Sequence, residues 1–254
     1  MGQPATLRVR DQGMEQLAEL ANVAARLESS RPEEILEWAF DEFGAGIAIA
    51  TGFGAEGLVL IDIALGINEK PDIFFLDTEF LFPETYELRD RLEDRYGIRI
   101  RAVTGEHSSE AQERLFGPQL WEANPDLCCR LRKLEPMKEA LSGLAAWVTA
   151  IRRDQSYSRA SAQPVEWDHQ WGLVKVNPLV RWTRERIWDY IKLKNLPYNP
   201  LHDRGYPSIG CTHCTSSVTG SEDERAGRWR GHKKTECGLH GGAAPSVVSI
   251  VSTS

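Results

Sequence analysis

The cysteines are the residues of this chain whose types and spacing point most directly to chemistry. Four of them form two close pairs, Cys128 with Cys129 and Cys211 with Cys214, and the remaining thiol is Cys237. An odd number of cysteines with two adjacent is a poor disulfide framework, so the clustered thiols indicate metal or redox chemistry in a reducing compartment. The separate thiol at Cys237 indicates a nucleophile beside a metal centre.

Thiolates bind zinc ions and iron–sulfur clusters alike, so the ligand type alone does not identify the metal. Directly adjacent cysteines fit poorly around one tetrahedral ion, whereas neighbouring thiolates can bind different irons of a cubane. The spacing therefore favours a 4Fe-4S cluster, with a structural zinc ion as the alternative. The alternative that the cysteines serve only as small buried apolar residues explains the pattern less well, because Cys211 and Cys214 lie in a polar turn flanked by glycine.

Cys237 lies in a cationic stretch of the chain. His240 follows it by three residues. The cations that precede it are Arg225, Arg228, Arg230, Lys233 and Lys234. Positive neighbours favour the thiolate form of a cysteine, which is the form that attacks electrophiles. A solvated basic tail with an incidental thiol is an equally good interpretation of this stretch alone.

Three further segments could bind an anionic ligand. The turn Thr51-Gly52-Phe53-Gly54 could present backbone N–H groups to a phosphate, although it is not a Walker motif. Arg152 and Arg159 follow an apolar run and offer planar donors to an oxyanion, unless they belong to an ordinary charged loop. Asp77 could accept a hydrogen bond from a ribose hydroxyl or simply cap a turn.

Strand and helix patterns alternate along most of the chain. Three- and four-residue apolar steps predict helices at 14–27 and 31–43, and further helices are expected at 58–65, 84–96, 124–142 and 183–194, with a kink at Pro136. Apolar runs predict strands at 46–50, 73–76, 98–103, 146–151 and from 174. This alternation predicts a mostly parallel sheet flanked by helices, with ligands at the carboxyl ends of the strands.

The composition is that of a soluble globular protein, with 254 residues, 41% of them hydrophobic and 26% charged. A formal net charge of −7 gives no overall attraction for nucleic acid or anionic lipid. We find no apolar run long enough to span a membrane and no secretory leader, so we expect a cytoplasmic protein.

Four segments closely resemble the assimilatory adenylyl-sulfate (APS) reductases, which belong with the 3′-phospho-APS (PAPS) reductases. They are the runs 128–136, 152–159, 211–214 and 234–240, which contain Cys-Cys-Arg-Leu-Arg-Lys, Arg-Arg-Asp-Gln-Ser-Tyr-Ser-Arg, Cys-Thr-His-Cys and Glu-Cys-Gly-Leu-His. Phe75-Leu-Asp-Thr78 and Phe82-Pro-Glu-Thr-Tyr86 are similar to the nucleotide-binding core of that family. The resemblance spans residues from about 46 to 240.

The resemblance implies an adenine-nucleotide hydrolase-like, Rossmann-like α/β fold and a thioredoxin-dependent reduction of APS to sulfite and AMP in sulfate assimilation. Cys237 would be the nucleophile and form an S-sulfocysteine, and an external dithiol such as thioredoxin or a glutaredoxin-like protein would release sulfite. The four paired cysteines would bind one 4Fe-4S cluster, and relatives are often oligomeric. PAPS reduction, alone or beside APS reduction, is the nearest alternative, and a zinc-stabilised nucleotide-binding module is more remote.

The resemblance also implies the contacts to the substrate. The residues expected at the phosphosulfate are Lys133, Arg159, Arg225, Arg228 and His240, with the Thr51 turn around the nucleotide. Thr51-Gly-Phe and Ala150 depart from the commoner serine and glycine of relatives. We expect a helical lead-in at 1–45, a nucleotide- and cluster-binding domain at 46–214, a mobile segment with Cys237 at 215–240 and a flexible tail at 241–254.

Overall fold

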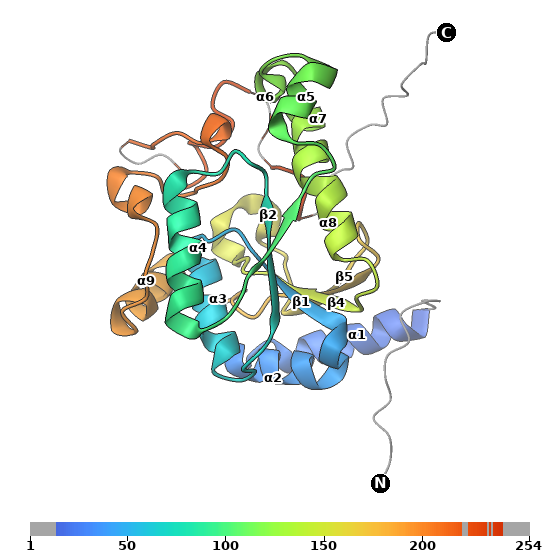
Figure 1. Ribbon diagram of the computed structural model, residues 1–254. Coiled ribbons are helices and arrows are strands. Elements are labelled where there is room, and N and C mark those ends of the chain that lie inside the picture. Colours follow the sequence, from blue (N-terminus) through green and yellow to red (C-terminus); the bar gives the residue numbers. More distant parts are fainter. Residues whose placement is uncertain (1–13, 220–222, 233, 235, 241–254) are drawn as a thin grey trace.

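The computed structural model describes residues 14–219, 223–232, 234 and 236–240 (Figure 1). Its centre is a six-stranded sheet with the order β3-β2-β1-β4-β6-β5. The strands are β1 (Ile47–Thr51), β2 (Asp72–Asp77), β3 (Arg101–Thr104), β4 (Ala146–Val148), β5 (Val165–Asp168) and β6 (Leu173–Val176). All neighbours pair in parallel except β5, which runs antiparallel to β6. The predicted fold class, a mostly parallel α/β sheet, is confirmed.

Helices cover both faces of the sheet, because alternate residues of β1, β2 and β4 are apolar and buried on opposite sides. The larger core packs the face containing Ile49, Phe75 and Val148 against five helices. These are α1 (Met14–Leu27), α2 (Pro32–Phe43), α3 (Ala55–Leu65), α4 (Pro83–Tyr96) and α9 (Arg184–Leu193). The other face, with Phe74 and Trp147, packs against Met137 and Ala140 of α8 (Glu135–Ala140).

The remaining helices lie where the chain passes from β3 to α8. They are α5 (Ser109–Phe116), α6 (Leu120–Ala123) and α7 (Pro125–Cys129). A π-helical turn, Arg130–Leu134, joins α7 to α8, so the single helix predicted over 124–142 is interrupted. The irregularity precedes the predicted kink at Pro136, which lies near the start of α8; proline lacks an N–H donor and crowds the carbonyl four residues earlier.

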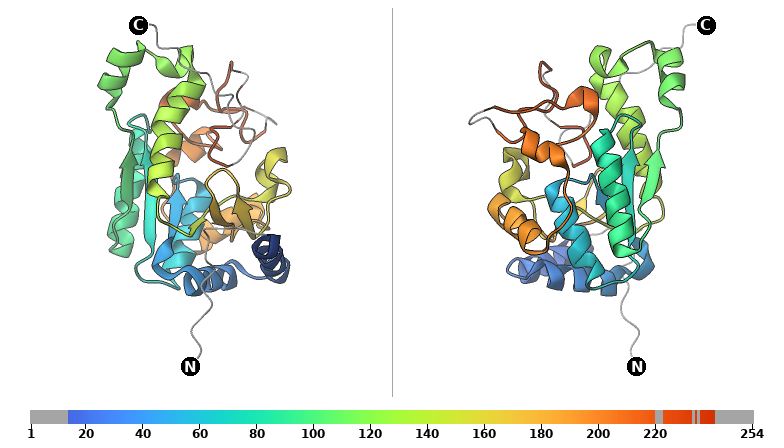
Figure 2. Two further views of the ribbon diagram at one scale, coloured as in Figure 1. Left: turned by 90° about the vertical axis from the view of Figure 1, so that its right-hand side faces the viewer. Right: turned by 60° about the vertical axis from the view of Figure 1, so that its left-hand side comes forward.

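The chain after α9 crosses the carboxyl ends of the strands, on the same end of the molecule as α5, α6 and α7 (Figure 2). α1 and α2 of the predicted helical lead-in pack into the larger core and do not stand apart from the sheet. The predicted flexible tail, 241–254, lies outside the described residues. In the part of the chain that the structure describes, no helix is both long and apolar enough to cross a bilayer.

Candidate functional site

The glycine-rich turn after β1 forms one wall of a pocket at the carboxyl end of the sheet. Thr51 ends β1, and its Oγ1 accepts a hydrogen bond from the backbone N–H of Phe53 at 3.1 Å. A Cβ at Gly57 would lie 2.7 Å from the same oxygen, so only glycine leaves room for this arrangement. Phe53 adopts φ +58 and buries its ring against Phe75, which fixes the path of the turn.

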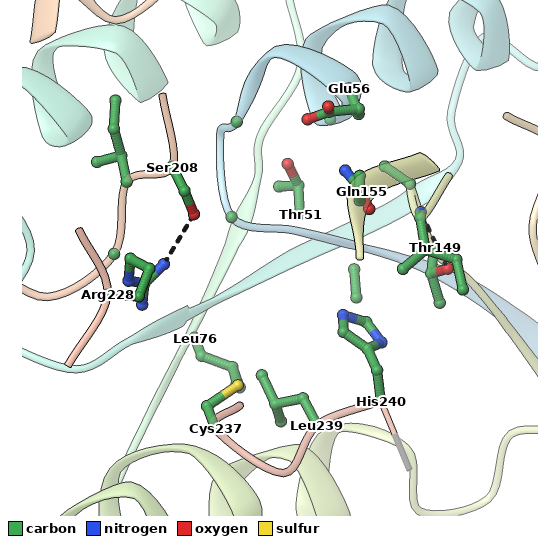
Figure 3. Close-up of a pocket in the computed structure, with 18 of the residues that line it drawn as sticks. Thr51, Glu56, Leu76, Thr149, Gln155, Ser208, Arg228, Cys237, Leu239 and His240 are labelled. Carbon is green, nitrogen blue, oxygen red and sulfur yellow. Dashed lines mark hydrogen bonds between the residues drawn. The ribbon is translucent and has the colours of Figure 1, made fainter. Parts of the chain in front are cut away.

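Residues from distant parts of the chain close the pocket. Figure 3 shows Thr51 and Glu56 opposite Cys237 and His240, with Arg228 and Ser208 to one side. Of the residues predicted to act on a substrate, nine line this pocket. They are Thr51, Gly52, Gly54, Lys133, Arg159, Arg225, Arg228, Cys237 and His240.

Three arginines, Arg159, Arg225 and Arg228, line the pocket together with three glutamates. Burial and the neighbouring Arg225 lower the pKa of Arg159, and the same two causes lower the pKa of Arg228. Arg228 donates to Ser208 Oγ at 3.4 Å and lies over the ring of Trp229 at 4.7 Å from its centroid. Closely spaced guanidinium groups in a buried site are suited to bind an anionic ligand.

His240 anchors the end of the described C-terminal segment. Its ring stacks on Trp147 with centroids 5.6 Å apart, and its Nδ1 is buried without a hydrogen-bond partner among the described residues. Burial, with Arg159 and Lys175 nearby, holds the pKa of His240 well below its usual value. The segment is also held by Gln170, which donates to Gly238 O at 2.7 Å, and by the Trp171 indole N–H, which donates to Leu239 O.

The four paired cysteines line one small cavity beside this pocket. Cys128 and Cys129 come from α7, and Cys211 and Cys214 come from the turn before the C-terminal segment. Backbone pairing of Leu81 with Cys211 fixes this turn to the loop after β2. The prediction that these four cysteines lie together is therefore matched by the geometry of the described chain.

The chemistry of the four sulfurs fits a bound metal centre. Burial and the other sulfurs raise the pKa of Cys128 to about 12, and burial and Cys211 raise the pKa of Cys214 to about 11. Cys211 differs: its pKa is lowered although burial acts to raise it, because Lys133 and a 3.3 Å contact with Thr78 Oγ1 favour the thiolate. Thiols that oppose one another's ionisation become good ligands once a cationic centre neutralises them.

Among the described residues, no three His, Cys, Asp or Glu side chains converge closely enough to hold a single metal ion. A tetrahedral zinc ion with Zn–S bonds of about 2.3 Å requires such convergence. A cubane binds each thiolate at a different iron, so its ligands stand farther apart. The four cysteine side chains nevertheless share one cavity.

Lys133 joins the two parts of the site. It lies on the π-helical turn after Cys129, is 8% exposed, and lines both the cysteine cavity and the pocket that contains Cys237. Burial acts to lower its pKa, but Cys211, Cys237 and Cys129 outweigh this and raise it. A buried ammonium group therefore lies between the four paired cysteines and Cys237, the candidate nucleophile.

Three residues predicted to contact substrate do not line the pocket, namely Phe53, Asp77 and Arg152. Asp77 accepts hydrogen bonds from Tyr86 Oη at 2.7 Å and from the Glu79 backbone at 2.9 Å, which matches the turn-capping alternative. Arg152 is fully buried and pairs with Glu56 at 2.9 Å, as well as with Asp154. Direct substrate contact by these three residues stays an untested prediction.

Several pocket residues were not predicted as site residues from the sequence. They include Glu56, Trp147, Gln155, Glu224 and Glu236. Trp147 carries only the signal of an apolar strand, since its role comes from stacking on a residue 93 positions later. Glu236 directly precedes Cys237 in the segment Glu-Cys-Gly-Leu-His, and this adjacency is the sequence feature that could have indicated a place in the site.

Comparisons with known proteins identify the relatives of this chain. The profile of the phosphoadenosine phosphosulfate reductase domain matches residues 46–217. The adenosine 5′-phosphosulfate reductase 2 of Bacillus subtilis is 50% identical over 208 residues, covering 82% of this chain and 88% of the relative. The adenosine 5′-phosphosulfate reductase of Salinibacter ruber is 44% identical over 222 residues, covering 87% and 88%.

Among solved structures, the phosphate complex of phosphoadenylyl-sulfate (PAPS) reductase from Candida auris is similar, with a TM-score of 0.70 and 32% identity. The match covers 82% of this chain and 99% of that chain. An FMN adenylyltransferase of Candida glabrata shares the fold at a TM-score of 0.55 and 14% identity. The matched domain, the identity to these reductases and the shared fold show that this chain belongs to the phosphoadenosine phosphosulfate reductase family.

Proposed function

We propose that the protein reduces adenosine 5′-phosphosulfate to sulfite and AMP, with Cys237 as the nucleophile and an external dithiol of the thioredoxin type as the reductant. The observation that carries this proposal is the position of Cys237, which lines the same pocket as the Thr51 turn and the arginines. The curated relatives named adenosine 5′-phosphosulfate reductase support the choice of substrate.

In the first proposed step, the Cys237 thiolate attacks the sulfur of the sulfate group. A bond forms between Cys237 Sγ and that sulfur, the bond from the sulfur to the bridging oxygen breaks, and AMP leaves with the electron pair. The attacking group and the substrate are both anionic, so cations must offset their charges. We assign this role to Lys133, Arg225 and Arg228, and the positioning of AMP to Arg159 and the Thr51 turn.

In the second proposed step, a thiolate of the external dithiol attacks Cys237 Sγ in the S-sulfocysteine. Sulfite leaves with the electrons of the sulfur–sulfur bond, and a mixed disulfide forms between the two proteins. The second thiol of the dithiol then displaces the Cys237 thiolate. The dithiol is oxidised to a disulfide and the sulfate sulfur gains two electrons. The chain has five cysteines, and with four in the proposed cluster site none remains to resolve the intermediate internally.

We also propose that Cys128, Cys129, Cys211 and Cys214 hold one 4Fe-4S cluster. The proposal is supported by their shared cavity and by the mutual opposition of their ionisation. When bound, the cluster would supply a charged structural centre beside Lys133, and the dithiol already accounts for both electrons. Reduced thiols of this kind favour a cytoplasmic setting, and self-association stays a prediction.

Reduction of PAPS is the second candidate, because the similar Candida auris structure is titled a PAPS reductase. That substrate carries one more phosphate group than APS. The rates of sulfite release with APS and with PAPS, measured at equal concentration with the same thioredoxin, distinguish the candidates. A higher kcat/KM for PAPS would replace the first proposal with the second.

The central experiment traps the covalent intermediate. Protein incubated with isotopically labelled APS in the absence of reductant is expected to carry a sulfonate on the peptide that contains Cys237. The adduct should be lost, with release of labelled sulfite, on addition of reduced thioredoxin. The Cys237→Ser variant is the control, and sulfite release by that variant would disprove the assignment of the nucleophile.

A further inference from the structure

Glu236, the residue before Cys237, bridges two arginines of the pocket. Its Oε1 lies 3.5 Å from Arg159 Nη2, and its Oε2 lies 2.8 Å from Arg225 Nη2. The carboxylate therefore places one oxygen against each guanidinium group. All three side chains are largely buried, with exposures of 10% for Arg159, 18% for Arg225 and 26% for Glu236.

The Glu236 carboxylate offsets the positive charge of the two neighbouring arginines. They come close enough for Arg225 to lower the pKa of Arg159, and Lys175 and Arg225 also face the neighbouring His240. Buried like charges without a counter-ion are strongly unfavourable, so a carboxylate between them stabilises the closed pocket. The Nε of Arg159 is buried and has no hydrogen-bond partner in the described chain, which leaves a donor available to a ligand.

We infer that the Glu236 carboxylate stands in for an anionic group of the substrate, holding Arg159 and Arg225 in the free enzyme and leaving them when the phosphosulfate binds. This inference rests on the proposed function. A phosphate or sulfate group at the arginines would present the same pair of oxygens, and its negative charge would repel the carboxylate. Substrate and Glu236 thus compete for one site.

The competition has a consequence for the neighbouring nucleophile. Glu236 and Cys237 are adjacent in the chain, so the two ion pairs of the carboxylate anchor the backbone beside the thiol, and their release removes that anchor. Release of Glu236 links the arrival of the substrate to the final placement of the thiol. Glu236 is in this sense a positioning residue, because it acts through Arg159, Arg225 and Cys237.

The opposite possibility is that Glu236 only orients the arginines for the substrate and remains bound to them. The Glu236→Gln variant separates these cases, because glutamine keeps the shape and one hydrogen-bonding oxygen but removes the charge. Competition predicts that AMP binds this variant more tightly than the wild type, by roughly 2- to 5-fold for a partly exposed ion pair. Orientation predicts weaker binding. Isothermal titration calorimetry with AMP measures the difference.

Glu224→Gln is the matched control. Glu224 lines the same pocket but pairs with Arg184 at 3.0 Å and Arg152 at 3.6 Å. Its substitution removes the same charge without freeing Arg159 or Arg225, so a smaller change in AMP affinity is expected. Steady-state assays with APS and thioredoxin should show that Glu236→Gln lowers KM by a larger factor than it changes kcat.

A second variant, Glu236→Ala, removes both the charge and the hydrogen bonds and should also bind AMP more tightly; circular dichroism verifies its fold. Unchanged or weaker AMP binding by both Glu236 variants would overturn the inference while leaving the proposed function intact. A wild-type protein that neither binds AMP nor releases sulfite from APS would overturn both. If Glu224→Gln bound AMP as tightly as Glu236→Gln, the gain in affinity would come from the lost negative charge alone. That result would also overturn the inference.

Discussion

Among the described residues, Lys133 is the one charged side chain that lines both the pocket and the cysteine cavity. Its ammonium group is buried, lines the pocket with Cys237 and the cavity with the paired cysteines, and lies 5.8 Å from the centroid of the Trp229 ring. A fixed cation in a water-poor site stabilises developing negative charge more strongly than one in solution. Its position suits it to offset charge on the sulfate oxygens while the thiol attacks.

We expect Lys133→Ala to slow the single-turnover formation of S-sulfocysteine on Cys237 by on the order of 10²-fold, the usual cost of losing one such group. The thermal unfolding midpoint should change much less, because the lysine adds little apolar burial to the core. Quenched-flow mixing with APS, followed by mass analysis, measures the rate. Lys138→Ala on the exposed face of α8 is the control. An unchanged rate in Lys133→Ala would remove the lysine from the mechanism.

Residue types with strict chemical demands could be predicted from the sequence, whereas residues defined by their partners could not. The cysteines were grouped correctly because few roles suit paired thiols. Arg152 is predicted at the substrate, and the structure adds that it pairs with Glu56 and Glu224 from opposite ends of the chain, which leaves the prediction untested. Arginine is suited to both roles, and only the fold distinguishes them.

At the scale of elements, the segment 236–240 acts as a strap across the pocket. It is held by the stack of His240 on Trp147, by the Trp171 indole N–H donated to Leu239 O at 3.2 Å, and by the Gln170 contact to Gly238. Lys234 also pairs with Asp126 of α7, just before the cysteines. The strap therefore ties Cys237 to the sheet, and Lys234 ties the same part of the chain to the helix that bears Cys128 and Cys129.

The strap should loosen below about pH 6.5, the ordinary pKa of histidine. Docking depresses the pKa of His240, through burial and then through Arg159, Lys175 and Arg225, so the docked ring stays neutral while the released ring takes up a proton. The contribution of the neutral His240 ring to the stability of the docked strap is therefore complete above this pH. Below it, the free energy of docking weakens by at most about 1.4 kcal/mol per pH unit.

Hydrogen exchange of the 236–240 peptide, expressed as protection factors to remove the intrinsic pH effect, measures this loosening. His240→Gln is the control, and its protection should not fall between pH 7.5 and 5.5. Equal pH dependence in the variant and the wild type would show that another group controls the strap. Burial also lowers the pKa of His202, whose ring meets Trp188 edge-on. His202 lies outside the 236–240 peptide, so exchange measured peptide by peptide separates its effect from that of His240.

Elements with a strong local pattern were predicted well, and those determined by tertiary packing were not. α1 and α4 match the predicted helices within one residue because their apolar periodicity is regular. The antiparallel edge strand β5 was missed, since Val165–Asp168 is short and obtains its strand geometry from pairing with β6. The strand predicted at 146–151 ends at Val148, where the chain leaves the sheet.

At the scale of the whole molecule, the site is assembled where the topology brings distant segments together. The Thr51 turn follows β1, the loop with Arg159 follows β4, and the segment with Cys237 crosses the ends of both strands. Parallel strands with helical crossovers place all their carboxyl ends on one edge, so a single ligand can be contacted from each loop. The paired cysteines connect α7 to the turn at 211–214 across 82 residues of sequence, from Cys129 to Cys211.

A cluster bound at that point should stabilise the molecule as well as its site. Removing iron with a chelator under anaerobic conditions would leave the buried thiols without a bound centre and cut the tie between α7 and the turn at 211–214. We expect the unfolding midpoint to fall by on the order of 10 °C. Differential scanning calorimetry, with iron and sulfide analysis of the same samples, checks this expectation.

The Cys237→Ser variant makes that experiment specific. Because Cys237 lines the substrate pocket and is absent from the cysteine cavity, its replacement should abolish sulfite release yet retain the iron and the same loss of stability on chelation. Cys128→Ser should lose iron and unfold at the lower temperature without any chelator, because it removes a ligand at the junction of α7 with the rest of the site. Equal iron content in Cys128→Ser and the wild type, or an unchanged midpoint after iron removal, would separate the paired cysteines from metal binding and leave them as buried thiols.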